Sequence, residues 1–397
     1  MVLLKAVLLR GLAAALACTS LLALGAQSER ATPSPDAALA SVFRDIEQGR
    51  LEQALAGVDA LLAAYPNFRL AHLIRGDLLL ARTRPLHTFG SLSDAPEEKV
   101  ADLRDEAMVR LEAYRHRPPE NYLPRYLLRM EPSQRYALVV DARRSRLYIY
   151  ENDEGRPRFV TDYYVTQGKL GAEKMREGDK RTPVGVYHVT AHLARQKLSD
   201  FYGSGAFPIS YPNEWDRLNG RDGHGIWLHG TPSDTYSRPP RASDGCVVLA
   251  NRDLEALSPY LQIGVTPVII SNAVEWLSLE DWTAERDNLN RQVENWRKDL
   301  ESLDVERYLS HYSRSFRSAE GDFAQWARQK RQIASAKTSV KVELNRLSVF
   351  RTPGRQDLVV ITFEQEYRSN TLSHVLKKRQ YWQKEGRRWK IVYEGLA

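Results

Sequence analysis

The sequence predicts a multidomain protein with a helical N-terminal region, a mainly-β central domain and an α+β C-terminal domain. Three observations support this prediction. Apolar residues recur every three or four positions up to about residue 117, alternate with polar residues between about 135 and 273, and return to helical spacing before a second run of strands. With 397 residues, of which 43% are hydrophobic and 27% charged, the chain is long enough for several globular domains.

The N-terminus has the composition of a secretory signal peptide. Two basic residues precede an apolar run, residues 11–26, that ends in small side chains. We therefore predict a signal peptide over residues 1–26, with cleavage after Gly25 or Ala26. A lipid anchor on Cys18 is the alternative. Either outcome exports the protein.

The charge balance argues against a nucleic-acid partner. The formal net charge is +7, and the basic residues are scattered rather than run together. In an exported protein, such a mild surplus fits an anionic cell-wall polymer or lipid headgroups better than nucleic acid. A merely solubilising surface explains the surplus equally well.

Residues 36–117 are predicted to form helices after a linker rich in proline, serine and alanine. Apolar residues keep helical spacing over residues 38–62, residues 66–67 interrupt it, and the pattern resumes over residues 70–80. This order of helix, turn and helix resembles a tetratricopeptide-type unit. Such a region binds partner proteins, here of the cell envelope, or serves as a packing cap for the next domain.

The central domain is predicted over residues 135–273 and is predominantly β. Two strands joined by a short turn open it, and we expect Ala137 and Val139 of the first strand to share a face with Leu147 and Ile149 of the second. Further strands are predicted at residues 159–166, 184–191, 225–228 and 265–271, and a helix at residues 251–261.

The C-terminal domain is predicted over residues 283–397. Helices are expected at residues 284–303, 305–316 and 323–335, and strands at residues 340–350, 357–369, 374–384 and 388–393. Helices followed by an antiparallel sheet make an α+β arrangement. In this order, and in segments such as VVITFEQEYRS and KKRQYWQKEGRRWKIVYEG, the domain resembles the SnoaL-like cone fold shared with nuclear transport factor.

Cys246 is the candidate nucleophile. It is the one cysteine left after removal of residues 1–26, so it has no disulfide partner in an exported protein. Its neighbours, residues 241–245, are polar and turn-forming, which favours a reactive thiol over a buried, inert one. His229 ends a predicted strand shortly before, and a returning loop brings its imidazole to the thiol as a base.

Residues next to this pair are expected to shape the site. The amides of Gly245 and Cys246 are candidate donors to the oxyanion of an acyl-transfer intermediate. Gly230 permits close backbone approach, and its carbonyl is expected to orient the imidazole. Ser243 is interpreted as a turn residue bonded to the backbone, and Asn251 as the cap of the following helix. One cysteine and scattered histidines make no convincing zinc site, so we expect no metal and no cofactor.

Three motifs together resemble the catalytic domain of the L,D-transpeptidases (YkuD-like). They are TPVGVY at residues 182–187, IWLHGT at 226–231 and SDGCVVLAN at 243–251. The resemblance implies that Cys246 is the nucleophile and His229 its base. It also implies a peptidoglycan substrate, and the flanking regions are similar to a Gram-negative branch of the family, which implies the periplasm.

Two positions depart from the family pattern. Asp244 stands where the family usually has a histidine, and Val248 where it often has an arginine. Asp244 can shape the turn or orient a donor, but it cannot act as an imidazole. Loss of the arginine removes a candidate carboxylate clamp, for which Arg238 or Arg241 is the substitute. The remaining candidates for substrate binding are Tyr211 and Trp227.

The resemblance implies a cysteine-dependent L,D-transpeptidase that acts on peptidoglycan stem peptides through an acyl-thioester. Two alternatives stay open. The same Cys/His site in an L,D-carboxypeptidase or a lipoprotein-releasing amidase would pass the acyl group to water. A non-catalytic scaffold that binds the cell wall would use only the flanking regions.

Overall fold

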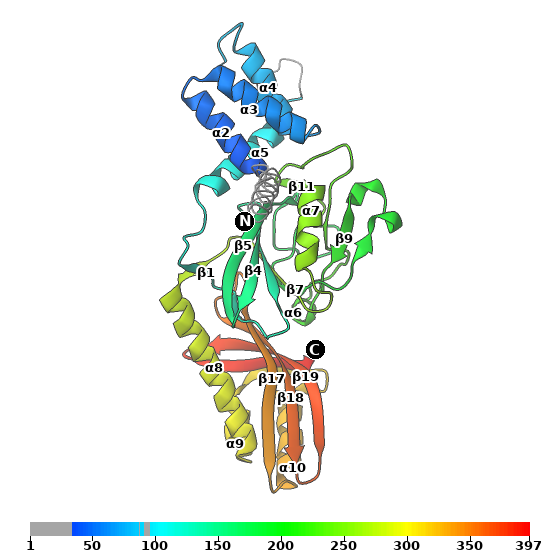
Figure 1. Ribbon diagram of the computed structural model, residues 1–397. Helices are drawn as coiled ribbons and strands as arrows, with labels where there is room; N and C mark the ends of the chain where they lie inside the picture. Colours follow the sequence, from blue (N-terminus) through cyan, green and yellow to red (C-terminus); the bar gives the residue numbers. More distant parts are fainter. Residues whose placement is uncertain (1–33, 87, 91–95) are drawn as a thin grey trace, which may run out of the picture.

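The computed structural model describes residues 34–86, 88–90 and 96–397. The signal peptide predicted over residues 1–26, with the alternative anchor Cys18, lies outside them. The helical region, the mainly-β domain and the α+β domain follow one another along the length of the molecule (Figure 1), so the predicted fold class is confirmed. No helix within the described residues is long and apolar enough to cross a membrane.

Within the described residues, four helices build the N-terminal region. They are α2 (Pro35–Glu47), α3 (Leu51–Ala64), α4 (Arg69–Leu80) and α5 (Glu97–Arg115). The Ser34 side chain accepts a hydrogen bond from the Ala37 amide at 3.2 Å and so caps α2. Apolar side chains of the four helices, Leu39, Val58 and Ile74 among them, meet in one core.

Two main sheets form the central domain. The first has the order β5-β4-β3-β13-β7 and the second β12-β10-β9-β8. Their bounds are β3 (Tyr136–Asp141), β4 (Arg146–Asp153), β5 (Arg156–Tyr164), β7 (Gly185–His188), β8 (Leu193–Ala194), β9 (Gly205–Pro208), β10 (Trp227–His229), β12 (Val247–Val248) and β13 (Pro267–Ser271). A smaller pair, β6 (Gln167–Gly168) with β11 (Arg241–Ser243), and the helices α6 (Glu214–Leu218) and α7 (Asn251–Leu257) complete the domain.

The first sheet is buried on both faces. One face packs against the second sheet and α7, and the other against the C-terminal domain. Leu138 lies opposite Ile149 in the register of β3 and β4. The expectation that Ala137 and Val139 share a face with Leu147 and Ile149 is therefore wrong, because all strand positions are apolar when both faces are covered and the pattern no longer reveals which side chains point together.

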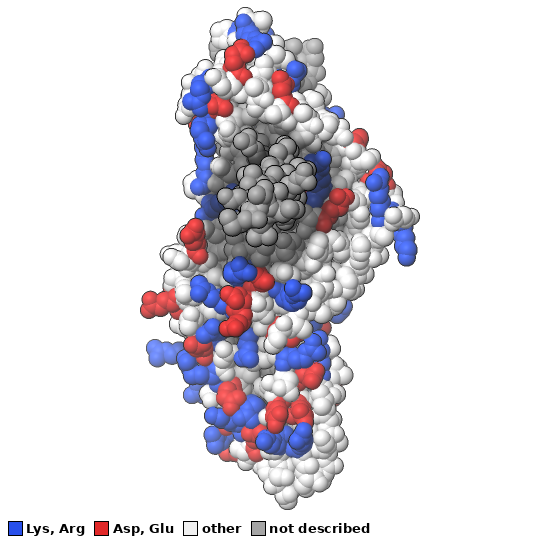
Figure 2. Space-filling model, in the orientation of Figure 1, with Lys and Arg blue, Asp and Glu red and all other residues white. Residues whose placement is uncertain are grey.

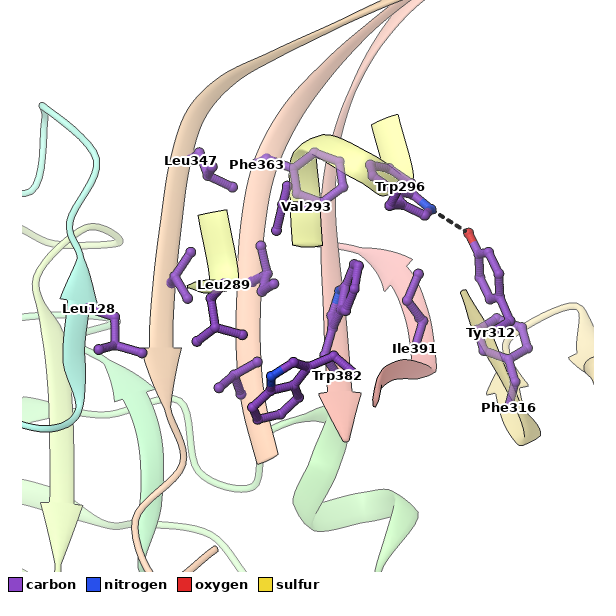
Figure 3. Close-up of a cluster of buried hydrophobic side chains, with 14 of the residues drawn as sticks. Leu128, Leu289, Val293, Trp296, Tyr312, Phe316, Leu347, Phe363, Trp382 and Ile391 are labelled. Carbon is purple, nitrogen blue, oxygen red and sulfur yellow. Dashed lines mark hydrogen bonds between the residues drawn. The ribbon is translucent and has the colours of Figure 1, made fainter. Parts of the chain in front are cut away.

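In the C-terminal domain, one sheet packs against helices. The sheet has the order β16-β15-β20-β19-β18-β17-β2, in which the edge strand β2 is Leu127–Arg129. The elements are α8 (Leu279–Glu301), α9 (Val305–Leu309), β15 (Tyr312–Ser318), β16 (Gly321–Asp322), α10 (Phe323–Ser335), β17 (Val340–Arg351), β18 (Leu358–Ser369), β19 (Ser373–Glu385) and β20 (Arg388–Leu396). Figure 3 shows the core between α8 and the sheet, in which Trp296 donates to the Tyr312 hydroxyl at 3.3 Å.

One predicted helix of this domain is wrong in its second half. A helix was expected over residues 305–316, but α9 ends at Leu309 and β15 begins at Tyr312. Tyr312 and Phe316 are both buried in the core. Residues four apart share a face in a helix and also in a strand, so their spacing fits both structures.

Residues 122–129, which precede the central domain, contribute a strand to the sheet of the C-terminal domain. β1 (Tyr122–Pro124) pairs with β14 (Trp276–Ser278), and β2 (Leu127–Arg129) pairs with β17 at the edge of the C-terminal sheet. Trp282 of α8 also donates to Leu127 O at 2.9 Å. On the face drawn in Figure 2, basic and acidic side chains are interspersed over this C-terminal part of the molecule, without a continuous field of one sign.

Candidate active site

The strand register brings Cys246 and His229 to one face of the second sheet. β10 and β12 run parallel, with Leu228 opposite Val247 and His229 opposite Val248. Leu228 and Val247 are fully buried in the domain core. Cys246 directly precedes β12, and successive side chains of an extended chain point to opposite faces. Continuing the register by one residue puts its side chain on the same face as that of His229.

The His229 imidazole is held in one orientation. Its Nδ1 lies 2.7 Å from Gly230 O, so Nδ1 carries a proton and donates it to this carbonyl. The lone pair of Nε2 is then available to accept a proton. His229 is 1% exposed, and its ring packs against Tyr202 and Phe201 with centroids 5.1 Å and 5.8 Å away.

The Asn251 side chain ties the end of β10 to the loop beside it. Its Oδ1 accepts from the amides of Ser204 at 2.9 Å and Thr231 at 3.2 Å, and its Nδ2 donates to Thr231 O at 2.8 Å. A Cβ at Gly230 would lie 2.1 Å from this Oδ1, so the position requires glycine. The interpretation of Asn251 as a helix cap is wrong, because Ala250 is the N-cap of α7.

Removal of this amide should destabilise the protein. We expect Asn251→Ala to lower the free energy of unfolding by about 2–4 kcal/mol, because the backbone amides of Ser204 and Thr231 lose their partner. Denaturant unfolding measures the effect. Asn219→Ala, in which an exposed amide bonded to Trp215 O is removed, is the matched control and should change it by less than about 0.5 kcal/mol. Equal effects of the two substitutions would contradict the role of Asn251.

Burial keeps both the Cys246 thiol and the His229 imidazole uncharged. It raises the pKa of the Cys246 thiol to about 11, although the Trp227 amide and the Arg238 guanidinium act in the opposite direction. Burial also lowers the pKa of His229 to about 4. The thiol donates to Gly225 O at 3.4 Å. At neutral pH the site therefore holds a thiol and a neutral imidazole, and the proton has to move when the sulfur attacks.

This protonation state predicts how the thiol reacts with pH. Only the thiolate is alkylated, so the rate of Cys246 modification by iodoacetamide should rise about tenfold per pH unit between pH 6 and pH 9. Mass spectrometry of the mature protein follows the modification. His229→Gln should leave the slope unchanged, because the imidazole it replaces carries no charge in this range. A rate that levels off near pH 7 would show an ion pair instead.

The loop before Cys246 is closed by its own hydrogen bonds. Ser243 Oγ donates to Cys246 O at 2.6 Å and accepts from the Gly245 amide at 3.1 Å. The Gly245 amide, expected to face an oxyanion, is thus already engaged, and the Cys246 amide is the donor that the loop leaves open. Gly245 has a φ of 129° and a Cβ there would meet a backbone oxygen at 2.8 Å, so it shapes the turn. Asp244 is exposed and pairs with Lys169 at 3.2 Å.

Of the two candidate arginines, Arg238 is the one placed near the Cys246 and His229 pair. Its guanidinium lies 4.5 Å from the centre of the Phe201 ring, and its charge lowers the pKa of both the thiol and the imidazole. The other candidate, Arg241, points to the N-terminal region and pairs with Asp105 of α5 at 3.3 Å on the surface. The sequence alone assigns Phe201 no role, because no spacing links it to β10.

The two aromatic candidates lie in different places. Trp227 shares the face of Cys246 and packs against Tyr202, with ring centroids 4.9 Å apart. Tyr211 belongs to the domain core, and its hydroxyl donates to Asp222 O at 2.8 Å. The structure therefore groups Trp227, and not Tyr211, with the thiol.

In the described part of the chain, no three His, Cys, Asp or Glu side chains gather as metal ligands would.

Two parts of the chain match known families. Residues 135–270 match the L,D-transpeptidase catalytic domain, YkuD, and residues 288–395 match the Cds6 C-terminal NTF2-like domain. The fold and the site thus define an L,D-transpeptidase-type catalytic domain followed by an NTF2-like, SnoaL-like domain. The chain carries the catalytic domain of the YkuD family, and the resemblance found in its three motifs is confirmed.

Solved structures share more than one of these parts. Bd1075 of Bdellovibrio bacteriovorus is 29% identical, with a TM-score of 0.62 over 70% of this chain and 98% of that one. The helical cell shape determining protein Pgp2 from Campylobacter jejuni has the same fold. It is 24% identical, with a TM-score of 0.56 over 68% of this chain and 95% of that one. A point mutant of Pgp2 is 22% identical, with a TM-score of 0.57 over 76% and 100%. A comparison with curated protein sequences finds no significant match.

Proposed function

We propose that the protein is a periplasmic, cysteine-dependent L,D-transpeptidase that acts on the stem peptides of peptidoglycan. One observation carries the proposal: the unpaired thiol of Cys246, directly before β12, lies beside the segment that leads into β10, and β10 ends with the oriented imidazole of His229. The match of residues 135–270 to the YkuD catalytic domain supports peptidoglycan as the substrate.

The reaction proceeds through an acyl-thioester. Cys246 Sγ adds to the carbonyl carbon before the terminal D-amino acid of a stem peptide, while its proton passes to His229 Nε2. The Cys246 amide donates to the oxyanion. The carbon–nitrogen bond then breaks, and the imidazolium returns the proton to the leaving amine. An acceptor amine of a second stem peptide attacks the thioester and gives its proton to His229. The carbon–sulfur bond then breaks, and His229 passes the proton to Cys246 Sγ, which restores the thiol.

Product analysis tests the proposal and identifies the acceptor. Purified mature protein is incubated with disaccharide tetrapeptides, and the products are separated and weighed by mass spectrometry. Transfer yields crosslinked dimers, whereas capture by water yields tripeptide monomers and identifies an L,D-carboxypeptidase. Cys246→Ala should give neither product.

The non-catalytic alternative has a distinct outcome. A scaffold would leave tetrapeptides unchanged, and its thiol would gain no mass from a carbapenem-type acylating probe. A wild-type protein with both properties would overturn the proposed enzyme activity, whereas an acylated Cys246 supports it.

Periplasmic location is part of the proposal and rests on the composition of residues 1–26. Mass spectrometry of protein released by osmotic shock should find a mature N-terminus after Gly25 or Ala26. Recovery of a lipid-modified Cys18 in the membrane fraction would show instead that the protein is anchored to a membrane.

A further inference from the structure

The loop that joins the two catalytic strands is held by the N-terminal helices. The Tyr236 ring lies against those of Tyr65 and Phe68, with centroids 4.7 Å and 4.6 Å away. The Tyr236 amide donates to Asn67 O at 3.2 Å, and Arg69 donates to the Thr235 hydroxyl at 3.2 Å. The helical region thus contacts the segment between His229 and Cys246 directly.

A buried charge cluster lies behind this contact. Arg110 of α5 pairs with Asp36 at 2.6 Å and with Glu106 at 2.9 Å, and its guanidinium lies 3.7 Å from the centre of the Tyr164 ring. The side chains of Arg110 and Glu106 are 4% and 1% exposed. Glu106 accepts a further hydrogen bond from the Ser237 hydroxyl at 2.7 Å. A buried carboxylate with so few partners holds each of them strongly.

Two sets of contacts lead from this charge cluster to Arg238, one through Ser237 and one through Tyr164. Ser237 precedes it in the chain, and the Tyr164 hydroxyl, next to Arg110, donates to Arg238 O at 2.9 Å. Thr166 donates to the same oxygen at 3.0 Å. The Arg238 carbonyl is therefore held by two side chains of the catalytic domain, and the preceding residue, Ser237, is held by Glu106 of the helical region. The Arg238 guanidinium lies over the Phe201 ring, which packs against the His229 imidazole.

We propose that Glu106, acting through Ser237, is a positioning residue for Arg238, and that Arg238 binds the terminal carboxylate of the acyl-donor peptide. The helical region is then part of the substrate site. This inference rests on the proposed function and extends it, since it selects peptides with a free C-terminal carboxylate. Arginine suits the task because its planar donors match a carboxylate.

The test compares two substrates that differ only in this carboxylate. Tetrapeptides that end in a D-amino acid with a free carboxylate or with a carboxamide are given to the wild type, Arg238→Gln and Ser237→Ala. Arg238→Gln should raise KM for the acid by at least about tenfold and leave KM for the amide within about twofold, whereas loss of its charge changes kcat for both substrates alike. Ser237→Ala should raise KM for the acid about 3- to 10-fold, with kcat within about twofold.

Matched variants separate positioning from a loss of structure. Ser233→Ala removes a hydroxyl of the same loop that bonds to the exposed Asp200 at 3.0 Å, and it should change neither substrate. Ser237→Thr keeps the hydroxyl and should restore the preference for the acid. An equal loss on acid and amide in Ser237→Ala would mean that the bond only stabilises the fold, and would overturn the inference.

A binding measurement keeps the inference separate from the proposed function. In the Cys246→Ala background, calorimetry should find tighter binding of the acid than of the amide, and Ser237→Ala should reduce this difference. A wild type without turnover but with this preference would refute the proposed activity and leave the inference intact. Turnover without any preference for the acid would refute the inference alone.

Discussion

Replacement of Cys246 by serine is expected to lower the release of the terminal D-amino acid by at least about 1000-fold. A hydroxyl holds its proton far more tightly than a thiol, and the pKa of His229, lowered to about 4 by burial, makes the imidazole a weak base. A thiol whose pKa is about 11 can still give up its proton as it attacks, whereas a hydroxyl at the same place cannot do so at a useful rate.

The substitution should leave the fold intact, because serine is smaller and can donate to Gly225 O as the thiol does. Thermal unfolding at the wild-type midpoint is the control, and Cys246→Ala should show the same loss of turnover. A serine variant within tenfold of the wild type would mean that the sulfur is not the nucleophile.

Replacement of Arg110 by leucine is expected to cost about 3–5 kcal/mol of stability, because it leaves Glu106 as a buried carboxylate without its cation and Asp36 with Arg146 alone. The helical region should separate from the catalytic domain before either unfolds. Denaturant unfolding followed by fluorescence should then show an additional early transition, and protease should cut the loop at residues 231–241 faster.

A second arginine of the same helix provides the matched control. Arg115 pairs with Glu47 at 2.8 Å, but the two side chains are 56% and 61% exposed. Arg115→Leu should change stability by no more than about 1 kcal/mol. Adding Asp36→Asn and Glu106→Gln to Arg110→Leu should recover part of the loss, because neutral amides are less costly to bury. Equal effects of Arg110→Leu and Arg115→Leu would contradict the role of the buried cluster.

Local chemistry indicated the proposed catalytic pair from the sequence. Cys246 stands out as an unpaired thiol in a turn, and His229 ends a strand a short loop earlier, so both are found without knowledge of distant contacts. Their neighbours were harder to assign. Arg238 and Arg241 lie on one loop with the same chemistry, and only the packing of α5 and Phe201 determines which of them faces the thiol.

Contacts between distant segments account for the remaining differences. Spacing predicted α10 at the residues where it occurs, but it could not distinguish the helix expected through Phe316 from the strand that pairs with β20. Nor could it reveal that Leu127 joins a sheet whose other strands come from the opposite end of the chain. A strand of three residues has no periodicity of its own, and its partner defines it.

The pairing of β2 with β17 determines the order in which the molecule can be completed. During synthesis, Leu127 and Leu128, both fully buried in the finished protein, emerge long before β17, so the edge of β2 stays unpaired until the catalytic domain and helices α8 to α10 have been made. A protein shortened at the end of the catalytic domain would keep this apolar edge open to water. The last domain to leave the ribosome is thus the one that pairs with the segment linking the first two in the chain.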